Sequence, residues 1–300
     1  MNAAPQVNAL RGNLLLDEPM SKHTSWRIGG PADRYYQPAD IEDLAQFLAQ
    51  LPATEPVFWL GLGSNLLVRD AGIRGTVIAT SGVVNGLSQL DETTVRAEAG
   101  VACAKVARFC ARAGLSGSAF LAGIPGTMGG ALAMNAGAFG GETWDVVAAV
   151  ETVDRHGRLH RRTPNEFEIA YRHVRGPQGE WFIAAELQLE GGGNSDLLLA
   201  EIKALLSKRS DTQPTQLPNA GSVFRNPEAD YAARLIEACG LKGICEGAAC
   251  VSDKHANFII NTGGATAHDV ETLIERITHT VAEKMSVQLQ REVHIVGEGV

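Results

Sequence analysis

The residues best suited to bind a ligand lie in two short glycine-rich loops. The first, Gly61 to Leu66 (GLGSNL), directly follows an apolar run typical of a buried strand. The second, Ala122 to Gly130 (AGIPGTMGG), is stiffened by Pro125. Such loops offer several backbone N–H groups, which can bind a diphosphate without any cation, and Ser64 and Asn65 add polar side chains. The two loops therefore predict a phosphate site built mainly from main chain.

The first loop does not match the common nucleotide-binding fingerprints. Leu66 occupies the third glycine position of a Rossmann loop, and no βαβ unit with its ribose-binding acid is recognisable. No Gly-Lys-Ser/Thr follows, which excludes a P-loop. One such loop alone is usually a turn, but two, with a polar Asn-Ala-Gly segment after the second, favour a long dinucleotide such as FAD. The expected cofactor-binding residues are Gly61, Gly63, Ser64, Asn65, Leu66, Gly123, Ile124, Pro125, Gly126, Gly129, Gly130, Asn135, Ala136 and Gly137.

Apolar periodicity predicts the elements that position these loops. Asp40 is expected to cap a helix over 41–51, and a helix-like middle is expected between the two glycine loops of the Gly/Ala-rich run 117–141. His156-Gly157 marks the turn of a hairpin. Strands are expected at 56–60, 76–80, 93–100, 146–155, 158–162, 181–190, 255–261 and 287–297, and helices at 101–114, 197–211 (amphipathic), 230–240 and 265–285.

Length and composition indicate a globular protein with more than one domain. The chain has 300 residues, 45% of them hydrophobic, and one hydrophobic core rarely serves so many, so two or three domains are expected. A boundary is expected in the Pro/Thr/Asn-rich run 210–221, and the last third predicts a compact α+β unit. The net charge of −8 argues against a nucleic-acid or anionic-membrane binder, but it allows a local basic pocket. No segment has the length of a membrane span.

The five cysteines predict neither a disulfide framework nor a zinc site, because their number is odd and no C-x-x-C occurs. Most are expected to be small buried hydrophobic residues, and no metal is expected. Reduced thiols and the lack of an export signal near the start predict a cytoplasmic protein. A monomer is expected, although no residue pattern addresses the oligomeric state. The cysteines are Cys103, Cys110, Cys239, Cys245 and Cys250.

Several long motifs then identify a family. They are HTSWRIGGPADRYYQPAD, GLGSNLLVRDAGIRGTVI, AGIPGTMGGALAMNAGAFG, IAYRHV, NAGSVFRNP, AARLIEACGLKG and VSDKHANFIINTGGAT. In these motifs, and in their order, the chain resembles the UDP-N-acetylenolpyruvoylglucosamine reductases, the MurB family. The resemblance runs from Lys22 to Gly297, and the compact final domain is similar to the shorter subtype, which lacks an extra loop.

The resemblance implies an α+β fold: a two-part FAD-binding domain of the vanillyl-alcohol-oxidase type plus a C-terminal α+β substrate domain. The implied divisions are 1–84, 85–210 and 211–300. It implies non-covalent FAD, NADPH as co-substrate, and a small-molecule substrate, UDP-N-acetylglucosamine enolpyruvate. NADPH would reduce FAD and leave, and the enolpyruvyl group would then be reduced to give UDP-N-acetylmuramate for peptidoglycan synthesis.

Three residues match the family's catalytic positions. Ser222 stands where the family places its proton donor, and it is a plausible acid only in a closed site that polarises it. Arg172 matches an arginine that could hold the substrate carboxylate through two parallel hydrogen bonds and stabilise the developing enolate. Glu292 matches the third position, where a raised pKa is expected beside another carboxylate. Val174 departs from the family, which usually has a small polar residue there.

Further residues are weaker candidates. Trp26, Tyr35 and Tyr36 could stack on a ring of the cofactor, but core packing is the expected role for at least two of them. For Asn257 a purely structural role is as plausible as ligand binding. The expected substrate-binding residues are Arg209, Arg225, Asn226 and Asn257.

Two alternatives stay open at this point. Another FAD-dependent oxidoreductase of the same fold would keep the loops but not need Ser222 or the HANFIIN motif. A non-catalytic binder of UDP-sugars would keep the loops without needing Arg172, Ser222 and Glu292 together.

Overall fold

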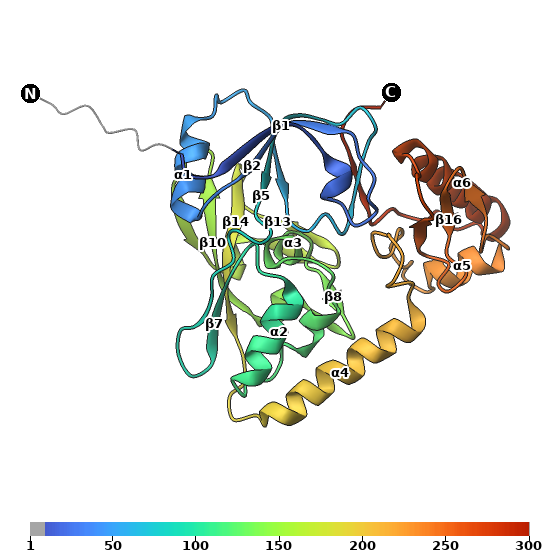
Figure 1. Ribbon diagram of the computed structural model, residues 1–300. Helices are drawn as coiled ribbons and strands as arrows, with labels where there is room; N and C mark the ends of the chain where they lie inside the picture. Colours follow the sequence, from blue (N-terminus) through green and yellow to red (C-terminus); the bar gives the residue numbers. More distant parts are fainter. Residues whose placement is uncertain (1–9, 300) are drawn as a thin grey trace, which may run out of the picture.

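The computed structural model describes residues 10–299, which form three parts (Figure 1). The first part (residues 10–86) is blue to teal in Figure 1, and the second (87–212) is green to yellow. The third part (213–293), orange to red, lies at the far side from helix α1. Helix α4 (Ser195–Thr212) runs along one edge of the second part toward the third.

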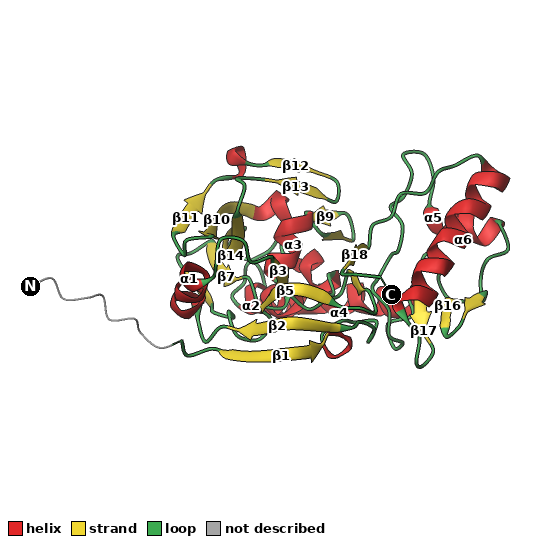
Figure 2. Ribbon diagram, turned by 90° about the horizontal axis from the view of Figure 1, so that it is seen from above, coloured by secondary structure: helices red, strands yellow, loops and turns green. Residues whose placement is uncertain are grey.

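The first part is a four-stranded sheet with the strand order β1-β2-β5-β3 and helix α1. Strand β5 lies between β2 and β3 and runs parallel to both, and β1 pairs antiparallel with β2. Figure 2 shows this sheet from above, with β1 at the outer edge and β5 next to the second part. The bounds are β1 (Asn13–Pro19), β2 (Pro31–Gln37), α1 (Ile41–Gln50), β3 (Val57–Leu60), β4 (Leu66–Val68) and β5 (Ile73–Ala79).

Helix α1 begins where the sequence predicted. The Asp40 carboxylate accepts a hydrogen bond from the backbone N–H of Asp43 at 2.9 Å, and such a cap contributes about 1 kcal/mol. The buried face of the helix includes Leu44 and Phe47, and the Phe47 ring stacks on Tyr36. This stacking fixes the helix against the sheet.

All three aromatic residues near the first motif belong to the core. Tyr36 donates to the buried Asp43 carboxylate at 2.6 Å, and Tyr35 stacks on His23 with its hydroxyl 3.0 Å from His23 Nδ1. Trp26 is fully buried, and its Nε1 donates to the carbonyl oxygen of Ile259 at 2.7 Å. The expectation of core packing therefore holds for all of them.

The second part is a five-stranded antiparallel sheet with the order β11-β10-β14-β7-β6. Its hairpin turns at His156-Gly157 as predicted, with Gly157 at φ +76°. Helices α2 to α4 and the β12–β13 hairpin pack with this sheet in one hydrophobic cluster. The bounds are β6 (Leu87–Gln89), β7 (Thr94–Glu98), α2 (Cys103–Arg112), α3 (Met128–Met134), β8 (Gly137–Ala138), β9 (Gly141–Glu142), β10 (Val147–Asp154), β11 (Leu159–Arg162), β12 (Glu168–Ala170), β13 (His173–Arg175) and β14 (Glu180–Gln188).

Two elements of the second part differ from their predicted patterns. Strand β14 is central rather than half-buried. Ile183 packs in the core around α1, whereas Ala185 packs in the core with α2 and α3; an irregularity in the pairing of β14 with β10 falls between the partners of Phe182 and Ala184. Helix α4 forms as predicted, but Ile202 is its only fully buried residue, and Leu197 is 71% exposed. Its amphipathic pattern therefore buries little.

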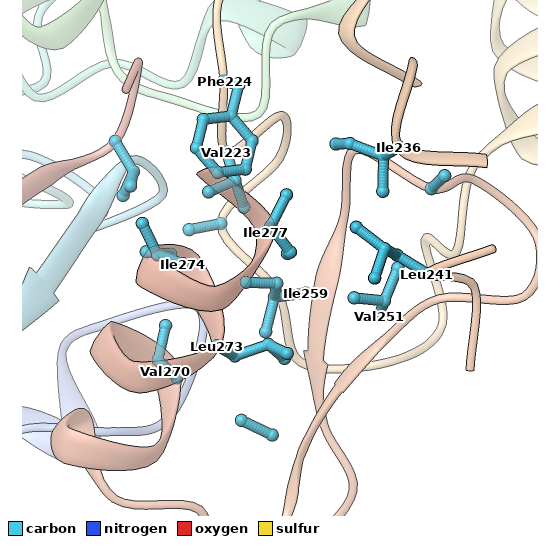
Figure 3. Close-up of a cluster of buried hydrophobic side chains, with 14 of the residues drawn as sticks. Val223, Phe224, Ile236, Leu241, Val251, Ile259, Val270, Leu273, Ile274 and Ile277 are labelled. Carbon is cyan, nitrogen blue, oxygen red and sulfur yellow. The ribbon is translucent and has the colours of Figure 1, made fainter. Parts of the chain in front are cut away.

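The third part packs a small sheet against helix α6, with Val223 and Phe224 beside Ile277 (Figure 3). The core extends beyond this part, because Trp26 and Leu67 of the first part belong to the same cluster. The bounds are α5 (Ala232–Ala238), β15 (Cys245–Glu246), β16 (Ala249–Val251), β17 (Ile259–Asn261) and α6 (Ala267–Met285).

Polar contacts also join the first and third parts. The Asp70 carboxylate accepts hydrogen bonds from the first N–H groups of α6, at 2.9 Å from Ala267 and 3.1 Å from His268. An anion at this end of a helix is favoured by its dipole. Arg69 pairs with Glu271 of α6 at 2.9 Å. The implied division at residues 84 and 210 stays a prediction.

The end of the chain returns to the first part. Only β18 (His294–Val296) of the predicted strand 287–297 forms a ladder, and it runs parallel to β4. The preceding residues instead contact the third part through a bridge between Phe224 and Arg291. Within residues 10–299, no helix is both long and apolar enough to cross a membrane.

One cysteine prediction is wrong. Cys245 and Cys250 form a disulfide across the β15–β16 hairpin, with their Cα atoms 4.1 Å apart. A two-residue turn at Gly247-Ala248 places residues five apart in sequence directly opposite each other, and this pairing has no fixed sequence motif. The other three cysteines are buried and free, as expected for small hydrophobic residues.

We predict that thiol titration of the oxidised, denatured chain gives three reactive thiols, because only Cys103, Cys110 and Cys239 are free. Prior reduction should raise the count to the full five. A Cys245→Ser/Cys250→Ser variant should give the same count with and without reduction. Five thiols in the untreated chain would show that the disulfide is absent.

Candidate active site

A cleft of about 550 Å³ lies where the three parts meet. Both glycine loops line it, and the β12–β13 turn, the segment before Val223 and the chain's last strand close its other sides. It contains sixteen of the twenty-one predicted site residues: Gly61, Gly63, Ser64, Asn65, Leu66, Gly123, Ile124, Pro125, Gly126, Gly130, Ala136, Gly137, Arg172, Arg209, Ser222 and Glu292.

The first loop presents free main-chain donors. Within residues 10–299, the backbone N–H groups of Gly63, Ser64 and Asn65 donate to no protein acceptor. Gly63 has φ +64°, and a Cβ there would collide with the carbonyl oxygen of His23. The turn thus requires glycine, and its unpaired N–H groups suit an anionic ligand such as a diphosphate.

The second loop leaves space on its cleft side. A Cβ added to Gly126 would meet only Ser64 Oγ at 3.5 Å and Ile124 Cγ2 at 3.8 Å, both from cleft-lining residues. Thr127 Oγ1 is buried and has no hydrogen-bond partner in the described chain. Unpartnered polar atoms and open space beside a second loop fit a long dinucleotide, so the residues present are compatible with FAD.

Two residues of this region have structural roles. Gly129 lies against Ala99, where a Cβ would come within 2.9 Å of the Ala99 Cβ, so it permits close packing of α3 on the sheet. Asn135 ends α3 in the left-handed conformation, and its side chain donates to Glu142 at 2.7 Å and to the Ala170 carbonyl at 3.3 Å. Neither residue lines the cleft.

Arg172 lies in the tight turn between β12 and β13 with φ +54°, a region that side-chain-bearing residues rarely adopt. Its guanidinium is held on three sides. Nε donates to Glu292 Oε1 at 3.0 Å, Nη1 to the Asn135 carbonyl at 3.2 Å and Nη2 to the Gly137 carbonyl at 3.1 Å. A guanidinium has five N–H groups, so one on each terminal nitrogen stays free for a carboxylate.

Val174, the departure from the family pattern, supports this turn. It lies opposite Ile169 across the hairpin, and both pack against the hydrophobic core of the second part. Its side chain therefore anchors the hairpin that carries Arg172.

Glu292 is buried against the Arg172 guanidinium, with only 15% of its side chain exposed. Burial raises the pKa of Glu292 above its ordinary value, and the opposing charges of Arg172 and Arg225 offset this rise only in part. The main chain is fixed as well: its N–H donates to the Val223 carbonyl at 2.8 Å, and its carbonyl accepts from Asn65 Nδ2 at 3.2 Å. The acidic side chain is thus held between the first loop and the third part.

Ser222 lines the same cleft from the third part. The preceding Gly221 has φ +75°, and its N–H donates to Asn219 Oδ1 at 2.9 Å. The chain directly after Ser222 pairs with the segment that carries Glu292. The fold therefore brings the three predicted catalytic residues, which come from distant parts of the sequence, to one cleft.

The predicted substrate-binding residues divide into two groups. Arg209 lines the cleft, where its Nη1 donates to the Gly123 carbonyl at 2.8 Å and its Nε to Gln213 at 2.9 Å. Burial lowers the pKa of Arg209, and in residues 10–299 no carboxylate forms an ion pair with it. A guanidinium in this state is suited to an anionic ligand.

Arg225, Asn226 and Asn257 do not line the cleft. Asn257 binds both main-chain groups of Phe224, at 2.9 and 2.8 Å, and Asn226 accepts from the N–H of Ala232 at the start of α5 at 3.1 Å. Arg225 donates to the main chain of Arg172. The structure gives each a contact within the protein instead of a position facing a ligand.

Sequence reasoning missed several cleft residues, including His294, Met134 and Gln213. His294 could have been found from the sequence, because it lies two residues after Glu292 in the predicted strand 287–297, and alternate residues of a strand point to the same side. Met134, 3.1 Å from Asn65 Nδ2 through its sulfur, carried no such signal.

The comparisons with known proteins agree with this architecture. Residues 32–163 match the family model of an FAD binding domain, and residues 213–296 match that of the C-terminal domain of UDP-N-acetylenolpyruvoylglucosamine reductase. A reductase of this name from Alkalilimnicola ehrlichii is 61% identical over 287 residues, 96% of each chain. One from Methylococcus capsulatus is 59% identical over 99% of this chain and 97% of its own.

A solved structure adds the three-dimensional match. The UDP-N-acetylenolpyruvylglucosamine reductase (MurB) of Thermus caldophilus superposes with a TM-score of 0.81 at 33% identity, over 96% of this chain and 99% of its own. The fold and cleft thus define an FAD-binding oxidoreductase with a separate C-terminal domain, which confirms the predicted fold class. The chain belongs to the UDP-N-acetylenolpyruvoylglucosamine reductase family.

We predict that Gly126→Val abolishes or strongly weakens FAD binding without unfolding the chain, because the new side chain would occupy cleft space rather than collide with protein. Flavin absorbance after gel filtration measures the retained cofactor, and circular dichroism reports the fold. Gly191→Val is the matched control, since an added Cβ there meets only atoms at 3.6 Å or more, outside the cleft. Full flavin content in Gly126→Val would contradict the assignment.

We predict that Glu292→Gln weakens the pH dependence of stability. A carboxyl whose pKa is raised on folding stabilises the protein fully below its unfolded value, near 4.5, and this contribution is lost as pH rises through the folded value. The variant, which does not titrate, should be no less stable than the original chain at about pH 8. Urea unfolding midpoints across the pH range test this, with the exposed Glu283→Gln as control; a large loss of stability at neutral pH would oppose it.

Proposed function

We propose that this chain reduces the enolpyruvyl group of UDP-N-acetylglucosamine enolpyruvate to UDP-N-acetylmuramate, with NADPH as reductant and FAD as bound cofactor, in the synthesis of peptidoglycan precursors. The observation that carries the proposal is the Arg172–Glu292 ion pair, which faces the same cleft as Ser222 and two open glycine loops. The names of the relatives that cover nearly the whole chain agree with it.

The chemistry defines what the cleft must supply. When bound, FAD supplies to the methylene carbon of the enolpyruvyl group the hydride that it has taken from NADPH. Negative charge then builds on the neighbouring carbon and on the substrate carboxylate. The two free N–H groups of Arg172 are proposed to bind that carboxylate, and the attraction would grow as the charge develops, which lowers the barrier.

A proton must then reach the carbon that carries the developing charge. Ser222 is the proposed donor, since it lines the cleft near this pair and a hydroxyl can act as an acid toward a strongly basic carbanion in a closed site. Glu292 accepts a hydrogen bond from Arg172 Nε, and we propose that this contact keeps the guanidinium in one position during the reaction. Arg209 is proposed to bind an anionic group of the substrate or cofactor.

An anaerobic titration tests the whole proposal. The purified yellow protein should bleach with NADPH and recover its colour when UDP-N-acetylglucosamine enolpyruvate is added. Bleaching without recovery would indicate another flavoenzyme of this fold. A colourless protein that takes up no FAD would leave a non-catalytic nucleotide binder as the better account.

We predict that Ser222→Ala leaves the bleaching by NADPH unchanged and slows the recovery step by about 10²- to 10⁴-fold, the range typical of a lost general acid. Stopped-flow absorbance separates the two steps. Ser207→Ala, on the exposed face of α4, serves as control. Equal recovery rates in Ser222→Ala and the original chain would remove Ser222 from the proton transfer.

A further inference from the structure

Two residues of the third part, Glu292 and Arg225, hydrogen-bond to Arg172. Its side chain is bound by Glu292, and its main-chain carbonyl accepts a hydrogen bond from Arg225 Nη2 at 3.2 Å. The second contact falls on the residue whose backbone is in the left-handed region, at φ +54°. A strained conformation of this kind persists only where surrounding groups hold it.

Arg225 and Glu292 lie on two extended segments that pair with each other. The N–H of Arg225 donates to the Gln290 carbonyl at 2.8 Å, the N–H of Glu292 donates to the Val223 carbonyl at 2.8 Å, and an isolated bridge joins Phe224 to Arg291 between them. The two extended segments therefore present Arg225 and Glu292 to Arg172 as a unit.

The position of Arg225 speaks against the role that the sequence suggested for it. The side chain is absent from the cleft lining, and its Nε is buried without a partner in the described chain. Its positive charge nevertheless acts on Glu292, because it opposes the rise of the Glu292 pKa, as the charge of Arg172 does. A residue in this place can influence the cleft only through its neighbours.

We propose that Arg225 is a positioning residue, which fixes the main chain of Arg172 in its left-handed turn and sets the charge balance of the Arg172–Glu292 pair. The cationic group of the cleft is then complete only when the third part is docked against the β12–β13 turn. This inference rests on the proposed function, since it assigns Arg225 a part in the same reaction.

The charged and titratable groups near Glu292 come from several elements. Arg172 belongs to the β12–β13 turn, Arg225 to the paired segment, and His294 follows on β18. Tyr171 lies beside Arg172, and its pKa is raised mainly by burial, with smaller effects from nearby charges that include Glu292 and Arg225. The first loop contributes the uncharged amide of Asn65. Removal of the Arg225 charge therefore shifts Glu292 toward its protonated form, and any kinetic limb governed by Glu292 moves to higher pH.

The test uses three substitutions at this position in the flavin-loaded protein. Arg225→Met removes the hydrogen bond and the charge, and should lower kcat and kcat/KM together by up to about a hundredfold, the cost of a misplaced catalytic group. Arg225→Lys keeps both and should restore most of the rate. Arg225→Gln keeps a donor without charge, and should retain more rate than Arg225→Met while its pH profile shifts upward.

Two further measurements make the outcomes decisive. Bleaching by NADPH should be unchanged in every variant. Arg291→Met is the matched control, because it removes the charge of a neighbouring residue whose side chain lines a separate hollow beside α6. A raised KM with normal kcat in Arg225→Met would mean direct substrate contact and would overturn the proposal. So would an unshifted pH profile in Arg225→Gln, or an equal effect of Arg291→Met. If the proposed function itself were wrong, the original chain would not be reoxidised by the enolpyruvyl sugar at all.

Discussion

The parallel pairing of β18 with β4 is the interaction on which the cleft depends. It brings the last strand of the chain back to the strand that follows the first glycine loop, and the N–H of His294 donates to the carbonyl of Asn65 at 3.2 Å. Asn65 in turn binds the carbonyl of Glu292. This long-range contact holds Glu292, the acidic partner of Arg172, directly beside the first glycine loop.

Local features of the fold were predictable because their causes are local. The Asp40 cap, the Gly157 turn and the two glycine loops are set by side-chain hydrogen bonds or backbone conformation within a few residues. The partners of strands were not predictable in this way, since a short apolar run is compatible with several neighbours. For this reason the sequence did not predict the central placement of β14 or the disulfide between Cys245 and Cys250.

The candidate site shows the same division. Motif membership located the cleft residues well, yet it could not separate a side chain that faces the ligand from one that holds the motif together. Asn257 and Asn226 illustrate this, because their amide groups are used by nearby main chain. That use depends on the exact path of the backbone, which only the folded structure supplies.

The charge of the cleft differs in sign from that of the chain. Arg172, Arg209 and Glu292 are its only lysine, arginine or acidic side chains among the described residues, whereas the whole chain carries a net charge of −8. The charged side chains of the cleft therefore attract an anion, while the net charge of the whole chain repels it. Screening limits both effects to about 8 Å at physiological salt. The attraction of the cleft for an anion therefore acts at short range, over the last part of the anion's approach.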